Sequence, residues 1–480
     1  MSTDTTESLQ EESSGRATAE LYAAHKKIYA KAVSGFFTNW RWALVWITQI
    51  IFYGLPWLNW NGRSAVLFNL ETRRFYLFDL VLYPQDFIFL TALLMISAYA
   101  LFLFTAVAGR LWCGYACPQT VYTEIFMWIE KKFEGDRNAR MKLDAAPWSA
   151  DKLMRKVGKQ SAWLALSLWT GFTFVAYFTP MTKLLTEAGG LDFGPWEWFW
   201  IFFYGAATYG FAGFMREQIC KYLCPYARFQ GAMFDPDTLI ITYDESRGEP
   251  RGSRGKKVDY KSAGLGTCVD CGLCVQVCPT GIDIRNGQQY ECIGCAACID
   301  VCDGVMDKMG YERGLVRYST LNGMKNQWTK ADQIRHVFRP RVLIYTGILV
   351  VIVAALIYGI WSRDPFKVDV VRDRTTLARV VEDGAVENIY RLQIMNATES
   401  KQVYRVQVSG LDKAKIIPDD LVKIAPTEAE WVTVAVRIPF DTVQKESSGV
   451  KPLQFDIVRQ SDTADSQATV REKTTFVIPR

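Results

Sequence analysis

The chain has 480 residues, half of them hydrophobic and 14% aromatic, with a formal net charge of only +5. This composition is richer in large apolar side chains than that of a typical soluble protein, so it indicates a membrane protein with room for two or three domains. It gives no reason to expect a nucleic-acid partner. The two histidines, His25 and His336, exclude a haem or zinc site built on several imidazoles. Any metal chemistry must then come from the 12 cysteines.

The first predicted elements are a polar tail over residues 1–38, without the apolar core of a secretory signal, and four membrane spans within residues 39–240. A fifth span is predicted over residues 341–361. Each apolar stretch has the length that an α-helix needs to cross the hydrocarbon core, about 20 residues. Tryptophan and tyrosine cluster at the ends, as in "PWLNW" and "PWEWFW", which suits rings at the headgroup level. Buried helices of a large soluble protein are the alternative. The stretches cover residues 40–58, 86–108, 161–180, 196–215 and 342–361.

Basic residues near the span ends predict the orientation of the chain. The first outer loop contains only Arg63, Arg73 and Arg74, and the loop after the third span contains only Lys183. The segment between the second and third spans is rich in basic residues, so we expect it, the N-terminus and residues 216–339 to be cytoplasmic and the C-terminal part to lie across the membrane. The basic residues of that segment are Arg110, Lys131, Lys132, Arg137, Arg140, Lys142, Lys152, Arg155, Lys156 and Lys159.

Two cysteine pairs with the spacing CxxxCP lie at the predicted cytoplasmic ends of spans two and four. The first, "RLWCGYACPQT", contains Cys113 and Cys117, and the second, "EQICKYLCPYA", contains Cys220 and Cys224. A structural disulfide is not expected in this reducing compartment. If the helix continues through each pair, its two thiols share one face about one turn apart, and the following proline ends or redirects the helix. We expect the two pairs to converge into one four-sulfur pocket.

A pocket of soft thiolates prefers Cu(I) to harder, more highly charged metal states. Tighter binding of Cu(I) than of Cu(II) raises the potential of the copper couple, by about 59 mV for each tenfold difference in affinity. Such a pocket would draw an electron from a low-potential iron–sulfur centre onto Cu(II). Three alternatives remain open: the cysteines are small buried hydrophobic residues, they bind an extra iron–sulfur cluster, or they contact a quinone.

The remaining eight cysteines form two ferredoxin motifs. "CVDCGLCVQVCP" begins at Cys268 and has the bacterial spacing CxxCxxCxxxCP, and "CIGCAACIDVC" repeats it with Asp303 in place of the usual proline. In such motifs three cysteines bind one 4Fe-4S cluster and the fourth binds the other. A zinc site is the weaker alternative, because zinc sites usually group cysteines in CxxC pairs. The predicted ligands are Cys268, Cys271, Cys274 and Cys302 for the first cluster, and Cys292, Cys295, Cys298 and Cys278 for the second.

The soluble segments complete the predicted domain order. Residues 241–262 are rich in glycine and arginine and predict a flexible basic linker, followed by the ferredoxin domain over residues 263–320 and a cytoplasmic connector over residues 321–340. From residue 362 to 480 the sequence alternates polar and apolar residues in runs such as "KQVYRVQVSG" and "EWVTVAVRIP". This pattern predicts an antiparallel immunoglobulin-like β-sandwich without soft metal ligands.

The chain resembles the cytochrome c oxidase accessory protein family, of the FixG, RdxA or CcoG type. The likeness rests on "KIYAKAVSGFFTNWRW", both CxxxCP motifs, "RGEPRG", the paired ferredoxin motif, "RPRVLIY" and the sandwich tail. It implies a multi-pass protein of the bacterial inner membrane with a periplasmic C-terminal domain. The implied activity is a cupric reductase that supplies Cu(I) for assembly of the cbb-type oxidase, with copper at the four CxxxCP cysteines.

The resemblance also implies partners, namely the lipid bilayer, a copper transporter, oxidase assembly factors and a cytoplasmic electron donor, and it leaves a homodimer open. Two other functions fit the same motifs. The protein could relay electrons to a quinone or a partner reductase without copper, or it could be a non-catalytic scaffold that holds copper. Serine in place of Cys113 and Cys220 separates the three, because copper reduction fails in the first, electron transfer survives in the second, and only copper occupancy falls in the third.

Overall fold

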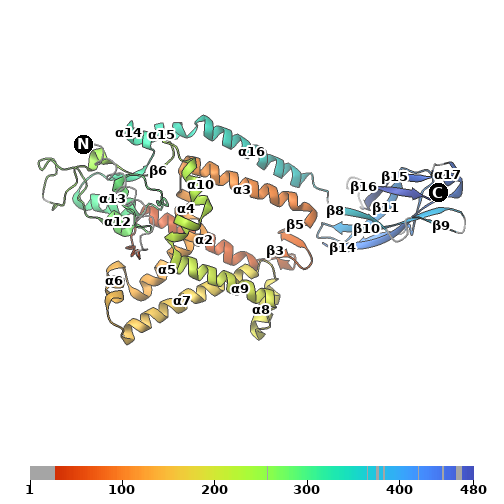
Figure 1. Ribbon diagram of the computed structural model, residues 1–480, viewed down its shortest axis with the longest axis horizontal. Coiled ribbons are helices and arrows are strands. Elements are labelled where there is room, and N and C mark those ends of the chain that lie inside the picture. Colours follow the sequence, from red (N-terminus) through yellow and green to blue (C-terminus); the bar gives the residue numbers. More distant parts are fainter. Residues whose placement is uncertain are drawn as a thin grey trace, which may run out of the picture. The chain divides into compact units, whose positions relative to one another are not determined.

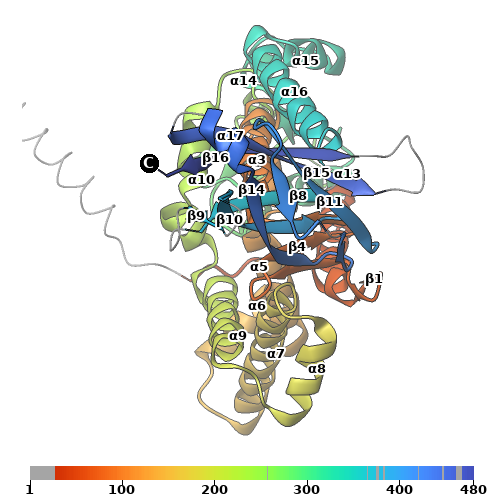
Figure 2. The same cartoon turned by 90° about the vertical axis from the view of Figure 1, so that its right-hand side faces the viewer.

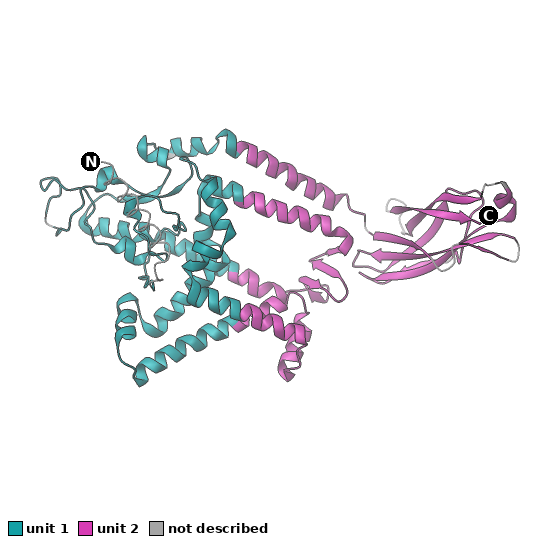
Figure 3. Cartoon of the chain, viewed as in Figure 1, with its two compact units in different colours: residues 1–48, 102–167, 206–342 teal, residues 49–101, 168–205, 343–480 magenta. Residues whose placement is uncertain are grey.

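The structure is a computed structural model that describes residues 27–256, 258–364, 366–373, 378–381, 384–419, 421–445, 448–460 and 468–479. The predicted tail therefore lies mostly outside the described residues, as does His25. The chain forms two compact units, shown in Figure 3. Unit 1 contains Phe102–Ser167, Ala206–Val342 and the residues up to Thr48, and unit 2 contains Gln49–Leu101, Leu168–Gly205 and Leu343–Arg480.

Helices lie at all five predicted spans (Figure 1). Among the described residues, only Pro84–Ala108 and Pro340–Trp361 are long and apolar enough by themselves to cross a membrane. The third helix begins at Ala150 instead of near residue 161, so it includes charged turns that lower its hydropathy. The five-helix membrane bundle stays a prediction. The helices are α2 (Phe36–Gly54), α3 (Phe87–Ala108), α7 (Ala150–Val175), α9 (Pro195–Thr208) with the π-helical η3 (Tyr209–Met215), and α16 (Pro340–Trp361).

The C-terminal part of unit 2 is a sandwich of two antiparallel sheets, seen from two directions in Figures 1 and 2. One sheet has the order β12-β14-β10-β8 with β9 paired to β10, and the other has the order β13-β11-β15-β16. The prediction of an all-β domain is confirmed, although the three shortest strands were not predicted. The strands are β8 (Phe366–Arg372), β9 (Arg379–Val380), β10 (Val386–Asn396), β11 (Gln402–Ser409), β12 (Lys415–Ile417), β13 (Val422–Ile424), β14 (Ala429–Ile438), β15 (Gly449–Gln460) and β16 (Thr469–Ile478), and α17 spans Phe440–Lys445.

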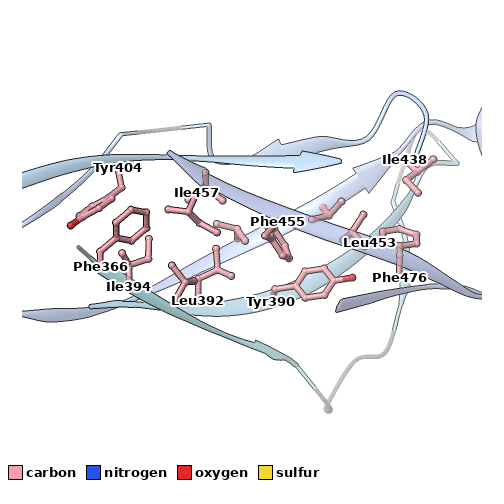
Figure 4. Packing of buried hydrophobic residues seen from close by; sticks show 14 of the residues in the cluster. Phe366, Tyr390, Leu392, Ile394, Tyr404, Ile438, Leu453, Phe455, Ile457 and Phe476 are labelled. Atoms are coloured by element: carbon pink, nitrogen blue, oxygen red, sulfur yellow. The ribbon is translucent and has the colours of Figure 1, made fainter. Parts of the chain in front are cut away.

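Alternation along the strands creates the core of the sandwich. In β15, Leu453, Phe455 and Ile457 are buried, whereas the residues between them are partly exposed. Successive side chains of a strand point to opposite faces, so one polar–apolar run supplies one wall of the core. Figure 4 shows these residues facing Tyr390 and Phe366 between the sheets.

The segment predicted to be the first outer loop forms a small β-structure that the sequence pattern did not predict. Strands β3 (Val66–Asn69), β4 (Arg74–Leu77) and β5 (Leu80–Leu82) form an antiparallel sheet, and β1 (Asn59–Trp60) pairs with β2 (Arg63–Ser64). Tyr83 follows β5, and its hydroxyl donates to the carbonyls of Asn396 and Thr427, at 3.0 Å each. The loop is therefore attached to the end of the sandwich.

A buried ion pair lies at the start of α3. The Asp86 side chain is fully buried, and one carboxylate oxygen lies 2.6 Å from the Arg363 guanidinium. Lys367 in β8 binds the other oxygen. The same carboxylate accepts the backbone N–H of Tyr83, at 3.1 Å. One buried acid therefore connects the start of α3 to the end of α16 and to β8.

In unit 1, helices α5 (Pro118–Glu134), α6 (Arg137–Ala145) and the first half of α7 form a hairpin with buried charges. Glu130 lies 2.6 Å from Arg140 and 3.1 Å from Arg216, and Glu134 lies 2.8 Å from Lys159. Burying an ion is costly unless an opposite charge compensates it. These pairs explain why α7 can begin with charged turns that pack against α5.

The segment predicted as a flexible basic linker packs against the ferredoxin motifs instead. Strand β6 (Ile240–Tyr243) pairs with β7 (Val316–Ser319), and α11 (Glu245–Gly248) follows β6. Arg254 donates to the carbonyls of Gly266, at 2.7 Å, and Cys268, at 3.2 Å. The guanidinium fork can donate to several carbonyls at once, which composition alone does not reveal. The predicted connector contains α14 (Leu321–Lys325) and α15 (Lys330–Val337).

Candidate metal centres

Each ferredoxin motif has the same local conformation. Gly272 at φ +61° precedes α12 (Leu273–Val277), and Ala296 at φ +60° precedes α13 (Ala297–Met309). This left-handed conformation suits glycine and costs more for alanine. In both motifs it turns the chain sharply between the second and third cysteines, so that the third cysteine lies in the first turn of a helix.

The fourth cysteines differ because of the residue that follows each one. Cys278 is extended at φ −70° and ψ 120°, and α12 ends before Pro279. Cys302 is helical, because Asp303 permits α13 to continue where a proline would end it. The Asp303 carboxylate also accepts the backbone N–H of Gly314, at 2.9 Å. The departure from the usual motif therefore changes the helix and adds a carboxylate beside Cys302.

The structure brings Cys302 to the cysteines of the first motif. Burial raises the pKa of the Cys302 thiol to about 12, and negative charge on Cys274 and Cys268 contributes to the increase. Burial also raises the pKa of Cys274 to about 11, with Cys271 among the groups that contribute. Together with Cys271, which interacts with Cys274, these cysteines are the ligands predicted for the first cluster.

Cys278 is joined in the same way to the cysteines of the second motif. Burial raises the pKa of Cys292 to about 12, and both Cys295 and Cys278 contribute to the increase. Burial raises the pKa of Cys298 as well, again with contributions from Cys295, Cys292 and Cys278. A small cavity is lined by Cys274 and by these four cysteines.

These eight thiols fit the donor set of two 4Fe-4S clusters. They form two convergent groups of four, and bound metal deprotonates a thiol whatever its pKa in the apoprotein. Within the described part of the chain, no group of three or more His, Cys, Asp or Glu residues is close enough to hold a single metal ion.

The CxxxCP pairs lie at breaks between helices. Cys113 lies in α4 (Leu111–Tyr115), but Cys117 is extended at φ −62° and ψ 129° and precedes α5. Cys220 lies in the π-helical η4 (Ile219–Leu223), and Cys224 is extended and precedes α10 (Pro225–Met233). The condition that one helix continues through each pair is therefore not met, and both residues that precede a proline are extended, as the sequence indicates. Proline forces the preceding residue out of the helical region and then starts the next helix.

The structure brings the four CxxxCP cysteines into one neighbourhood of unit 1. Burial raises the pKa of Cys113 to about 11, and Cys117 and Cys224 contribute to the increase. Burial raises the pKa of Cys220 to about 12, with contributions from the other three cysteines. The thiols are not close enough to form a closed site of three or more ligands for one ion. The arrangement is a group of partly buried thiols that can supply a few soft ligands at a time.

Two glutamines connect the pairs, and the sequence analysis identified neither. Gln119, two residues after Cys117, donates to the carbonyls of Phe211, at 3.0 Å, and Arg216, at 3.2 Å. Gln230 in α10 is fully buried, and its Nε2 lies 3.4 Å from the Cys113 sulfur. The glutamine that follows the first CxxxCP motif therefore contacts the backbone just before the second motif. The glutamine that follows the second motif contacts a thiol of the first.

The first CxxxCP loop touches the second ferredoxin loop. A Cβ added to Gly114 would lie 2.8 Å from the backbone nitrogen of Cys295, so the two backbones are in direct contact. The hydroxyl of Tyr318 donates to the carbonyl of Gly294 in the same loop, at 2.6 Å. The second ferredoxin motif therefore lies against the first CxxxCP motif. Cys271 of the first motif is the only exposed cysteine among the twelve, all of which the structure describes.

A carboxylate of the second motif also fixes the start of α2. Buried Asp300 accepts the backbone N–H groups of Phe37, at 3.1 Å, and Thr38, at 2.7 Å, as well as the Thr38 hydroxyl at 2.7 Å. A carboxylate at the first turn satisfies N–H groups that have no partner within the helix. Sequence reasoning missed this contact, although an acid inside the apolar run "CIDVC" is its one local signal.

Three protein-family models match the chain. Residues 215–321 match a 4Fe-4S dicluster domain, and residues 90–135 match a 4Fe-4S binding domain. Residues 356–479 match a model described as an IG-like fold at the C-terminus of FixG. The second match contains Cys113 and Cys117. The first contains all eight ferredoxin cysteines together with Cys220 and Cys224.

Curated proteins are similar over most of the chain. Nitrogen fixation protein FixG of Rhizobium meliloti is 40% identical over 430 residues, which are 83% of this chain and 82% of that protein. Protein RdxB of Cereibacter sphaeroides is 41% identical over 401 residues, covering 82% of this chain and 84% of that protein. Protein RdxA of the same organism is 40% identical over 398 residues, covering 81% and 84%.

Proposed function

Because the chain belongs to the FixG family of iron–sulfur proteins, we propose that it is an oxidoreductase that reduces Cu(II) to Cu(I) at Cys113, Cys117, Cys220 and Cys224. The product Cu(I) would serve the assembly of a cbb-type cytochrome c oxidase. The observation that carries the proposal is the backbone contact between Gly114 and Cys295. This contact supports the proposal, because partly buried soft ligands then lie near the predicted ligands of an electron-transfer centre.

The reaction needs one electron for each copper ion. When bound, the two clusters supply a low-potential one-electron path. The CxxxCP thiols bind the ion, and because thiolates hold Cu(I) more tightly than Cu(II), they shift the copper couple toward reduction. Burial gives Cys113 and Cys220 raised pKa values, so each thiol that binds copper releases a proton. Cu(I) accepts few soft ligands, so a group of thiols without a closed cage can bind it and release it.

The exposure of the cysteines suggests a direction for the electrons. Cys271 reaches the surface, whereas Cys295 is buried and contacts the CxxxCP loop. A donor in solution can therefore approach the first motif at Cys271 more closely than the second motif at Cys295. We propose that a cytoplasmic electron donor docks beside Cys271 and that electrons leave from the Cys295 side.

We further propose that the chain crosses the bacterial inner membrane five times. The two helices that can span a membrane alone support this topology, and aromatic residues at the ends of the other apolar stretches add to it. The basic residues between the second and third spans favour an orientation with the ferredoxin motifs in the cytoplasm and the sandwich in the periplasm. A copper transporter and oxidase assembly factors would then be the partners, and a homodimer is compatible with this arrangement.

The decisive experiment is anaerobic. The purified full-length protein is reduced with dithionite and freed of excess reductant, and stoichiometric Cu(II) is added while cluster absorbance and Cu(I) bound by a chromogenic chelator are followed. We expect the clusters to reoxidise and Cu(I) to appear in equal amounts. The double variant Cys113→Ser and Cys220→Ser should keep its cluster absorbance and lose both reactions. If Cu(I) forms equally fast in that variant, copper is not reduced at these thiols and the proposal is wrong.

A second candidate is an electron relay without copper, in which the CxxxCP cysteines hold a further iron–sulfur cluster. The match of residues 90–135 to a 4Fe-4S binding domain favours it. Iron analysis separates the two, because two clusters give about eight irons per chain and three give about twelve. About twelve irons in the wild type, falling to about eight in the double serine variant, would contradict the copper proposal and support a third cluster at the CxxxCP cysteines. A copper-holding scaffold would instead show copper occupancy that falls in this variant without any reduction in the wild type.

A further inference from the structure

Arg110 lies between the two sulfur sites. It directly precedes α4, and its side chain is 5% exposed. One guanidinium nitrogen donates to the carbonyl of Tyr290, at 2.5 Å, and another donates to the carbonyl of Ala227, at 2.6 Å. The guanidinium also lies over the Tyr290 ring, 4.6 Å from its centroid. One buried side chain thus joins three segments that are distant in sequence.

Each of these segments carries cysteines of one site. Tyr290 is two residues before Cys292 of the second ferredoxin motif, and Ala227 is three residues after Cys224. Arg110 is itself three residues before Cys113. The two hydrogen bonds therefore hold the second ferredoxin loop and α10 against the segment that begins the first CxxxCP motif.

The guanidinium of Arg110 donates to two backbone carbonyls, those of Tyr290 and Ala227. Among the residues that the structure describes, no carboxylate forms an ion pair with it, so its hydrogen bonds go to neutral carbonyls. Its two hydrogen bonds hold the guanidinium beside the chain just before Cys292 and just after Cys224, and Arg110 is itself close in sequence to Cys113, so the positive charge lies near cysteines of both sites. A buried cation without a carboxylate partner is costly and is best compensated by negative charge nearby.

We propose that Arg110 is a positioning residue that couples the second cluster to the CxxxCP thiols, both by fixing their contact and by stabilising negative charge on either side of it. The part that concerns transfer to copper rests on the proposed function, whereas the effect on the second cluster does not. Each electron that arrives at either site adds one negative charge. A fixed positive charge between the sites favours that electron on both sides, and low polarity around it strengthens the interaction.

The two roles need different properties of the side chain. Holding two carbonyls needs the planar fork of arginine, which a lysine ammonium on a flexible stem does not reproduce. Stabilising an added electron needs only the positive charge. Arg110→Lys keeps the charge and loses the fork, and Arg110→Gln loses the charge. The matched control is Arg155→Gln, which removes an exposed arginine that pairs with Asp151 on the surface of α7.

The first readout is the midpoint potential of the clusters in the full-length protein, titrated anaerobically and followed by electron paramagnetic resonance. We expect Arg110→Gln to make reduction of one cluster at least tenfold less favourable, which is about 59 mV, and to leave the other unchanged. Arg110→Lys and Arg155→Gln should keep both wild-type potentials. An unchanged potential in Arg110→Gln, in a protein with full iron content, would overturn the electrostatic role.

The second readout is the rate at which Cu(II) reoxidises the reduced clusters. We expect Arg110→Lys to be at least tenfold slower than the wild type despite its normal potentials, because the contact loosens. A wild-type rate in Arg110→Lys would overturn the positioning role. If the wild type itself does not reduce Cu(II), the proposed function fails while the potential shift in Arg110→Gln can still be measured. If Arg110→Gln does not load with iron, a lowered potential in Arg110→Lys overturns the charge role and an unchanged one supports it.

Discussion

The contact between the first CxxxCP loop and the second ferredoxin loop can be tested by adding a single methyl group. In Gly114→Ala the new Cβ would lie 2.8 Å from the Cys295 nitrogen and 2.8 Å from the Gly294 carbonyl carbon and oxygen. Ordinary van der Waals contact begins near 3.4 Å, so the loops must separate by about 0.6 Å, which is the difference between the two distances. Both neighbours are backbone and cannot move aside as a side chain can. Overpacking of this kind costs about 1–3 kcal/mol.

The matched control is the same substitution where space is free. A Cβ added to Gly304 in α13 would meet nothing within 4 Å, and alanine favours a helix over glycine by roughly 0.5–1 kcal/mol. On heating the holoprotein, we expect Gly114→Ala to lose cluster absorbance at a lower temperature than the wild type and Gly304→Ala at an equal or higher one. Cu(II)-driven reoxidation should slow only in Gly114→Ala. Wild-type stability and rate in Gly114→Ala would mean that the two loops are not in contact.

Three further substitutions test single carboxylates, two in α13 of the ferredoxin unit and one at the end of α6. Asp300→Ala should destabilise the protein by about 1–2 kcal/mol, because the first turn of α2 loses its acceptor, and a chemical denaturation curve measures this. Asp303→Asn removes a negative charge beside the first cluster and should raise its midpoint potential by tens of millivolts in a redox titration; a lowered potential would contradict this assignment of charge. Burial opposes ionisation of Asp144, but hydrogen bonds such as that from Lys156 dominate and hold its pKa below the ordinary range. The stability that it supplies is therefore present above its unfolded-state pKa, near 4, and is lost as the pH falls below that value, so Asp144→Asn should be less stable than the wild type at pH 7 and should lose less stability on acidification.

The features that the sequence predicted are those with a local pattern. Eight cysteines at ferredoxin spacing define a ligand set, because residue identity and short spacing together determine which irons they can reach. Alternation identifies a strand such as β15, since polar and apolar faces repeat along it. For residues 241–262 the composition predicted a flexible linker, which is wrong. A segment rich in glycine and arginine is typical of solvated chain, but here Arg254 donates hydrogen bonds to carbonyls of the ferredoxin unit.

The features that were missed depend on contacts between segments far apart in sequence. Asp300 caps a helix that begins more than two hundred residues earlier, and Gln230 reaches Cys113 from the helix after the other motif. Neither contact leaves a periodic signal, because each involves one polar side chain in an apolar surrounding. The start of α7 was predicted near residue 161 instead of at Ala150 for the same reason. The charged first turns of this helix are compensated by buried acids of α5, such as Glu134, and the local sequence does not show this.

The break before the second CxxxCP pair shows how such contacts serve the site. Arg216 has a positive φ of 38°, which is unfavourable for any residue other than glycine and costs on the order of 1–3 kcal/mol. Its side chain lies 3.1 Å from Glu130, and its carbonyl accepts a hydrogen bond from Gln119. Both partners belong to α5, the helix that begins directly after Cys117. The strained turn therefore persists because the first motif holds it, and Cys220, four residues later, is positioned by the segment that carries the other thiols. The geometry of the thiol group is thus a property of tertiary contacts between the two motifs, which is why neither CxxxCP motif alone specifies it.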